Sequence, residues 1–231
     1  MASDVSREPS GLSQKMDARG FAAKRELLGG PLIFLSLFTF YFTGNPGNTE
    51  GVFMSEYSFE TKDIFAWAEK LRAGDRVLLS GTVYTARDAA HKRICAMLDE
   101  GKEPPFSIPG AVVYYAGPTP TPPGMAIGSC GPTTSARMDP YAPRLLDLGL
   151  KAMIGKGDRS PEVVEAIRRN HAVYLCAIGG AGALAAKCVK SLQVIAFEDL
   201  GCESVKRLEI KDFPLTVAID CRGGNLFEAN P

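Results

Sequence analysis

Apolar runs alternate with segments of helical periodicity from about residue 61 to the end of the chain. Apolar residues at helical spacing between residues 61 and 72 are Ile64, Phe65, Ala68 and Leu71. Continuous apolar runs predict buried strands at residues 76–80, 111–115, 151–154, 171–178, 194–197 and 213–219. Further helices are expected through residues 85–101, from Pro161 onward and over 181–192. The first strands do not alternate cleanly with helices, so we expect an α/β fold with a mixed sheet.

The first 53 residues do not share this alternation. They begin polar and basic and then carry an apolar run at residues 31–42. Such a run is too short for an unaided membrane span of roughly 20 residues, and no small-residue cleavage site follows closely. Met54 opens a second, well-formed start. We interpret residues 1–53 as an N-terminal leader, unrelated to the rest and expected to be disordered, with Met1 a miscalled start and residues 54–231 the folded domain.

Composition restricts the classes of partner. The chain has 231 residues, 45% hydrophobic and 23% charged, and its formal net charge is zero. These values suit one domain with a sizeable core and provide no overall field that would recruit nucleic acid or a membrane. The six cysteines form no CxxC pair, and they are Cys95, Cys130, Cys176, Cys188, Cys202 and Cys221. We expect reduced thiols in a cytoplasmic protein, and no metal site within this chain.

The first candidate motif covers residues 85–93. Arg87 stands near the expected start of a helix, where a cation is mildly unfavourable unless an anion is bound. Thr85 and Asp88 have the spacing of a capping box, which explains Asp88 by structure alone. Arg87 and His91 are four residues apart and are expected to share one helix face. A guanidinium fits a carboxylate and an imidazole can move a proton, although a solvated helix face explains the same spacing.

The second candidate motif covers residues 131–139. Thr133 and Arg137 repeat the spacing of four residues, again at an expected helix start, so a second anion is predicted there. The alternative is that Thr133 or Thr134 merely caps the helix. Lys156 lies between two glycines at the end of an expected strand, where open α/β sheets bind ligands, although an ordinary turn lysine fits as well. Together these residues favour a small dicarboxylate as ligand.

Four segments together resemble a known family. They are ARDAAHKR at 86–93, GPTTSARMD at 131–139, IGKG at 154–157 and AIDCRGGN at 218–225. In this order they resemble the beta subunit of iron–sulfur hydro-lyases, the family of class I fumarate hydratases and L-tartrate dehydratases. The resemblance spans about residues 57–229. It implies a swivelling β/β/α domain that works with an alpha subunit.

The resemblance also implies the cofactor and the site. The [4Fe-4S] cluster would be held by the alpha subunit and none by this chain. Arg87, Arg137 and Lys156 would hold carboxylate oxygens, and Thr133 would lie close to the carbon that gains or loses a proton. His91 would act as a nearby acid or base. Whether His91 or Thr133 transfers the proton stays open at this point.

The function expected from the resemblance is hydration of fumarate to (S)-malate and its reverse, by a lyase active only with its alpha subunit in a hetero-oligomer. Asp139 at the end of the second motif favours the fumarate hydratases over the tartrate enzymes. The alternatives are an L-tartrate dehydratase, which converts tartrate to oxaloacetate and water, and a non-catalytic swivelling domain that binds another protein.

Overall fold

The computed structural model describes residues 55–228. These residues lie within the second of the two units of the chain, Phe53–Pro231. The predicted leader over residues 1–53 and the alternative start at Met54 lie outside the described residues.

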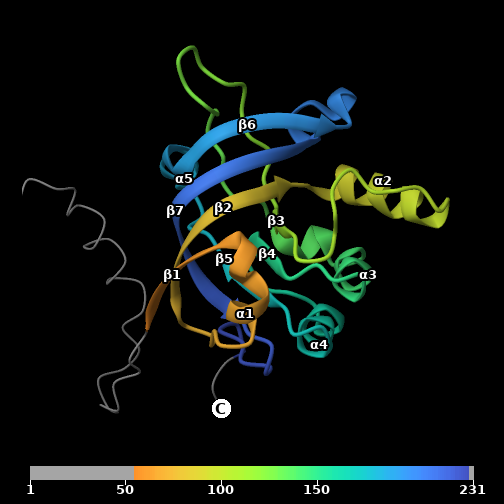
Figure 1. The fold of residues 1–231 in the computed structure, drawn as a ribbon, viewed down its shortest axis with the longest axis vertical. Coiled ribbons are helices and arrows are strands. Elements are labelled where there is room, and N and C mark those ends of the chain that lie inside the picture. Colours follow the sequence, from red (N-terminus) through yellow and green to blue (C-terminus); the bar gives the residue numbers. More distant parts are fainter. Residues whose placement is uncertain (1–54, 229–231) are drawn as a thin grey trace, which may run out of the picture. The chain divides into compact units, whose positions relative to one another are not determined.

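Seven strands form one sheet in the order β1-β2-β3-β4-β5-β7-β6. They are β1 (Glu56–Glu60), β2 (Arg76–Thr85), β3 (Val112–Tyr114), β4 (Ala152–Gly155), β5 (Val173–Cys176), β6 (Val189–Ala196) and β7 (Val205–Ile219). Neighbouring strands from β1 to β5 run parallel, whereas β7 runs antiparallel to β2, β5 and β6. Because β7 pairs with both β2 and β5, strands β2, β3, β4, β5 and β7 close into a ring (Figure 1). The predicted α/β class and mixed sheet are confirmed.

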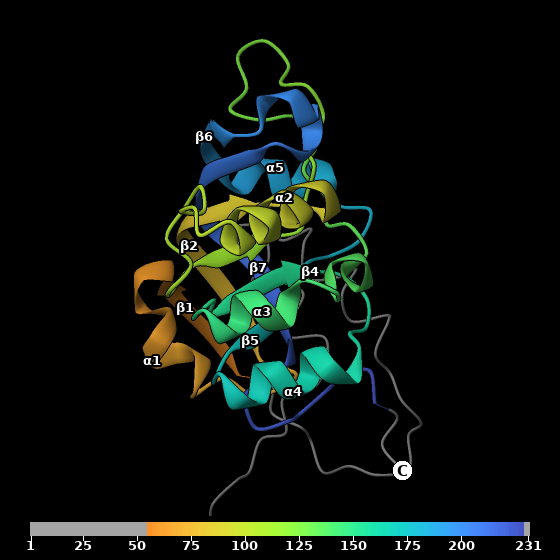
Figure 2. The same cartoon turned by 90° about the vertical axis from the view of Figure 1, so that its right-hand side faces the viewer.

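Short helical segments connect these strands. The α-helices in the described part are α1 (Ile64–Ala68), α2 (Asp88–Asp99), α3 (Ala142–Asp147), α4 (Pro161–Arg169) and α5 (Gly182–Cys188). The 3-10 segments there are η2 (Thr61–Asp63), η3 (Ser135–Met138) and η4 (Glu198–Glu203). Helices α2, α3 and α4 cover one face of the sheet (Figure 2). None of the helices within residues 55–228 combines the length and apolar character that a bilayer crossing requires.

Successive residues of the central strands contribute to two separate hydrophobic clusters. Val112 and Tyr114 of β3 pack in one cluster with buried residues of β2 and β7. Val113 and the following Tyr115 pack in the other, with buried residues of α2, α3 and α4. Both faces of these parallel strands are therefore covered, which explains why their sequence shows continuous apolar runs without alternation.

Two predicted helices are shorter than expected. The helix predicted over residues 181–192 ends at Cys188, and the chain from Val189 onward forms β6 against β7. Pairing with the long β7 outweighs the helical preference of this segment. The helix predicted over residues 61–72 is η2 followed by α1, and it ends at Ala68.

Strand β2 is longer than predicted because it continues through Gly81 across an irregularity in its pairing with β7. The register with β7 shifts between Leu79 and Gly81, and the strand continues to Thr85. Gly81 has φ 106°, and a Cβ there would lie 2.5 Å from Thr61 Oγ1. Only glycine suits this position, since it combines a positive φ with a close approach of the neighbouring chain. Strand β1, which pairs with β2, was not predicted.

Candidate active site

The three candidate motifs follow three adjacent strands. Register pairs Thr85 of β2 with Tyr114 of β3, and Tyr114 with Ile154 of β4. Because these strands are parallel, their carboxyl ends lie at the same edge of the sheet. Arg87 follows β2 directly, and Lys156 follows β4. The topology therefore brings the first motif and Lys156 to one edge, as expected of a ligand site in an α/β sheet.

The second motif returns to the same edge after a long loop from β3. The Thr133 N–H donates to the Tyr115 carbonyl at 2.7 Å. The Ser135 N–H donates to the Lys156 carbonyl at 2.9 Å, and the Lys156 N–H donates to Ser135 Oγ at 3.1 Å. A parallel bridge joins Thr134 with Lys156. Thr133 and Lys156 are thus held against neighbouring strand ends by backbone hydrogen bonds.

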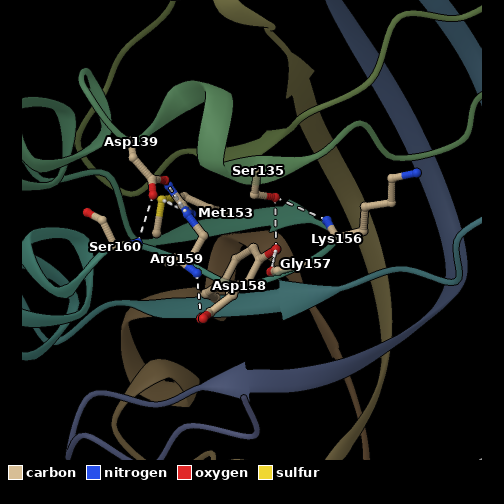
Figure 3. A network of polar contacts seen from close by, with 9 residues as sticks. Ser135, Asp139, Met153, Lys156, Gly157, Asp158, Arg159 and Ser160 are labelled. Atoms are coloured by element: carbon tan, nitrogen blue, oxygen red, sulfur yellow. Dashed lines mark hydrogen bonds and ion pairs between the residues drawn. The ribbon is translucent and has the colours of Figure 1, made fainter. Parts of the chain in front are cut away.

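Ser135 is the buried centre of this junction. The Tyr174 hydroxyl of β5 lies 2.8 Å from Ser135 Oγ and 2.9 Å from the Gly157 carbonyl oxygen (Figure 3). A Cβ on Gly155 would lie 1.9 Å from Ser135 Oγ, so β4 can end here only in a residue without a side chain. Figure 3 shows the Lys156 side chain extending away from this network. The network fixes the backbone of Lys156 and leaves its ammonium group to other contacts.

A buried ion pair holds the end of the second motif. Arg159 Nε donates to Asp139 Oδ1 at 2.7 Å, and the Ser160 N–H donates to Asp139 Oδ2 at 2.7 Å (Figure 3). The Arg159 side chain is fully buried, and its guanidinium lies over the rings of Tyr115 and Tyr174. Asp139 therefore links η3 to the start of α4. It has a structural role here.

The two arginines of the motifs take part in an alternating row of charges. Arg137 Nη2 donates to Asp88 Oδ2 at 2.8 Å, and Asp88 Oδ1 lies 3.8 Å from Arg87 Nε. Arg87 Nη2 lies 3.1 Å from Glu203 Oε1. The row Glu203–Arg87–Asp88–Arg137 is defined by these three contacts. By contrast, we find no hydrogen-bond or ion-pair partner for the Lys156 ammonium group within residues 55–228.

The predicted capping arrangements are wrong. Helix α2 begins at Asp88 with Arg87 as its N-cap, and no side chain caps it. Thr85 instead belongs to β2, where its hydroxyl accepts the Lys206 N–H at 3.1 Å. The second motif forms the short η3, and Thr134 at its N-cap also makes no side-chain cap. Spacing along the chain predicted the wrong arrangement for Thr85, because the hydroxyl that a cap would require accepts a hydrogen bond from a distant part of the chain instead.

The prediction of an anion at two helix starts is corrected as well. Arg137 lies in the last turn of η3, where a cation is favourable and requires no anion. At the start of α2 the anion is supplied by the chain itself. Glu203 Oε2 accepts the Ala89 N–H at 3.2 Å. Glu203 was not found from sequence, since no local pattern connects it with residues 114 positions earlier.

His91 lies behind this edge and not on it. Its ring is fully buried, with ring centroids of Tyr115 and Tyr141 at 5.4 and 6.1 Å. Nδ1 donates to the Arg87 carbonyl at 2.9 Å, which fixes the proton of the neutral ring on Nδ1. Burial lowers the pKa of His91 to about 4, so the ring is neutral at neutral pH. The structure brings Thr133, Arg137, Lys156 and Arg87 to one edge but does not bring the His91 ring there.

The acidic, histidine and cysteine side chains of the described residues are dispersed. Across residues 55–228, no group of three or more histidine, cysteine, aspartate or glutamate side chains lies in a position to hold a metal ion. The edge carries the cationic side chains of Arg87, Arg137 and Lys156 beside the carboxylates of Asp88 and Glu203. Cationic side chains of this kind can bind an anion by charge-assisted hydrogen bonds.

Comparison with known proteins identifies the family. Residues 48–230 match the family described as Fumarase C-terminus. The chain is 38% identical over 169 residues to the anaerobic class I fumarate hydratase of Escherichia coli, covering 72% of this chain and 31% of that protein. It is 40% identical over 156 residues to fumarate hydratase 2 of Leishmania major, covering 67% and 28%. It therefore belongs to the fumarase C-terminal family, and it spans less than a third of these fumarate hydratases.

A relative of similar length comes from an archaeon. Over 182 residues the chain is 38% identical to a Methanocaldococcus jannaschii protein provisionally named the beta subunit of L(+)-tartrate dehydratase. The match covers 75% of this chain and 91% of that protein. The expected resemblance to hydro-lyases of this family is thus confirmed.

The titration of His91 tests its burial. We expect the His91 ring signals to titrate near pH 4 in nuclear magnetic resonance spectra, with the Nδ1-protonated tautomer above that pH. The chain has two histidines, so a His171→Asn variant leaves a single set of signals. A ring that titrates near its ordinary value of 6.5 would contradict the burial described here.

The same shift has a consequence for stability. Between pH 6.5 and 4 the unfolded chain binds a proton at His91 that the folded chain does not. The free energy of unfolding therefore has its full value above pH 6.5. As the pH drops toward 4, the titration of this group lowers it by about 3 kcal/mol. A His91→Gln variant should lose this part of the pH dependence in urea unfolding measurements.

The buried and exposed arginine–aspartate pairs allow a matched comparison. Arg159→Met leaves the carboxylate of Asp139 in a buried site without its cation, and we expect a loss of about 3 kcal/mol or more in the free energy of unfolding. Arg169→Met removes an exposed pair with Asp147, which water and salt screen, and should cost clearly less. Urea unfolding measures both, and equal losses would contradict the structural role of Arg159.

Proposed function

We propose that this chain is the beta part of a hydro-lyase, and that its substrates are fumarate with water and (S)-malate. The observation that carries the proposal is the convergence of Arg87, Thr133, Arg137 and Lys156 on the adjacent ends of β2, β3 and β4. Arginine and lysine hold carboxylate oxygens by charge-assisted hydrogen bonds. The family membership and the fumarate hydratases among the relatives support the choice of reaction.

The cations suit the charge that this reaction develops. Removing a proton beside a carboxylate places further negative charge on its oxygens. Arg137 and Lys156 at the same edge would stabilise that charge more strongly than the charge of the substrate itself. Their positions are set before the substrate arrives, because Ser135 and the Arg159–Asp139 pair hold the backbone on both sides.

We propose Thr133 as the residue next to the carbon that gains or loses the proton. Its backbone is fixed by Tyr115, and it lies beside Lys156 across the Thr134 bridge. His91 has the better intrinsic pKa for proton transfer, but its buried ring does not reach this edge. We therefore assign His91 a positioning role, in which it holds the Arg87 carbonyl.

The remaining parts of the enzyme are proposed to come from an alpha subunit. The described residues do not fit an iron–sulfur cluster, since no set of cluster ligands comes together among them. We propose that the [4Fe-4S] cluster belongs to the partner, and that this domain swivels against it in a cytoplasmic hetero-oligomer. The steps assigned to this chain are binding and orienting the dicarboxylate and moving a proton at Thr133.

L-tartrate dehydratase is the second candidate. It is favoured by the length of the Methanocaldococcus jannaschii relative, of which the match covers 91%. That relative indicates a separate subunit of this size. Asp139 does not separate the two reactions, because its carboxylate is occupied by Arg159 and the Ser160 N–H.

The experiment that tests the function is anaerobic co-expression with the alpha subunit, followed by assays on fumarate, malate and both tartrates. We expect activity in the complex and none in the single chain. Thr133→Ala should abolish turnover, since the hydroxyl next to the reacting carbon is lost, whereas Thr134→Ala removes an exposed hydroxyl one residue away and should retain it. Equal activity of the two variants would contradict the role of Thr133. A complex inactive on all four acids would favour the non-catalytic domain.

Arg137→Lys tests the geometry of the carboxylate clamp. The variant keeps the charge but loses the planar fork of the guanidinium, so kcat/KM should fall roughly tenfold or more. Arg144→Lys is a matched control, because Arg144 pairs with Asp99 away from the edge at similar exposure. Near-normal kinetics for Arg137→Lys in the active complex would assign Arg137 to the solvated surface.

A further inference from the structure

The segment between β6 and β7 makes two acidic contacts with α2. Asp199 forms a bidentate ion pair with Arg93 on the exposed side. Glu203, four residues later, contacts the start of the helix: Oε1 lies 3.1 Å from Arg87 Nη2, and Oε2 accepts the Ala89 N–H at 3.2 Å. One carboxylate thus bridges a guanidinium and the backbone of the same helix start.

The Glu203–Arg87 pair is shielded from water, unlike the Asp199–Arg93 pair. The side chains of Arg87 and Glu203 are 19% and 20% exposed, against 43% and 63% for Arg93 and Asp199. An ion pair with this shielding is screened less by solvent and salt than one on the surface. Salt therefore weakens the Glu203–Arg87 contact less than the exposed Asp199–Arg93 pair.

Arg87 is also confined by the chain after β3. A Cβ on Gly117 would lie 3.0 Å from Arg87 Nη1 and 3.1 Å from its Cδ. The guanidinium and its stem thus pass close to the Gly117 backbone while Nη2 contacts Glu203. The Gly117 backbone therefore limits movement of the arginine on that side.

Glu203 itself is held by a buried lysine. The Lys206 ammonium group donates to the carbonyls of Gly201, Cys202 and Ser204, each at 3.1 Å, and to Ser204 Oγ at 2.7 Å. Lys206 is 6% exposed. Two of these acceptor residues, Cys202 and Ser204, directly flank Glu203 in the chain. The carboxylate is therefore carried by a backbone segment that is anchored on both sides.

We propose that Glu203 is a positioning residue, which fixes Arg87 so that its remaining donors are presented to the dicarboxylate at this edge. The inference rests on the proposed function for its effect on catalysis. The fixation of Arg87 does not depend on that function. Glu203 acts through Arg87 and does not itself touch the substrate.

Glutamine at position 203 keeps the size and one acceptor of the side chain but removes its charge. In the active complex, Glu203→Gln should lower kcat/KM about tenfold, with most of the loss in kcat, because a displaced arginine stabilises the transition state less. Asp199→Asn removes the same charge from the same segment and should change kcat/KM less than about twofold. An unchanged or raised kcat/KM in Glu203→Gln would overturn the proposal.

A second measurement does not depend on turnover. Guanidinium signals of Arg87 in the nitrogen-15-labelled full chain, assigned by their loss in Arg87→Lys, report how freely the group rotates. We expect hindered rotation in the wild type and in Asp199→Asn, and free rotation in Glu203→Gln. Hindered rotation in all three would overturn the proposal. A complex inactive on every dicarboxylate would refute the proposed function, whereas the Arg87 signals would still decide the role of Glu203.

Discussion

The pairing of β7 with two different strands is the constraint on which the rest of this domain depends. β7 runs antiparallel to β2 along most of its length and then pairs with β5 near its end. This closes the ring and holds the carboxyl ends of β2, β3 and β4 side by side at one edge. β7 begins directly after Glu203 and Ser204, so ring closure also places Glu203 next to Arg87. β7 thus closes the ring around the directly paired strands β2, β3 and β4, and the segment before it supplies the Glu203 contact of the charge row.

The central strands and the helices α2 and α4 could be predicted because the burial of their own residues sets the pattern of apolar and polar positions in their sequence. Pro161 at the first position of α4 and Ser160 before it mark that helix start as expected. The Ser160 hydroxyl does not cap the backbone, however, and a hydrogen bond from it contributes to a lowered pKa of Glu162. Elements stabilised mainly by distant partners were predicted poorly: β1 was not predicted, and only the end of β6, within residues 194–197, was, because their own sequence does not contain the reason for their conformation.

The candidate site shows the same division. The residues that contact a ligand in the proposed function, Arg87, Thr133, Arg137 and Lys156, lie in motifs that sequence alone singled out. The residues that hold them, such as Tyr174 and Glu203, come from strand β5 and from the segment before β7, and no spacing along the chain relates them to the motifs. His91 was found by its spacing to Arg87, but spacing does not tell how deeply a side chain is buried. Burial of the His91 ring against aromatic side chains lowers its pKa and keeps it neutral.

The alternating row of charges affects how an anion arrives at this edge. Opposite charges a few ångströms apart cancel at a distance, and the whole chain has a formal net charge of zero. The attractive field of the row therefore fades within a short range, and electrostatic steering contributes little to the rate of encounter. Association would proceed at an ordinary diffusive rate with weak dependence on ionic strength. Within the proposed function, selection among anions then depends on contacts made at short range, through the Lys156 ammonium group outside the row and through the spacing of the donors.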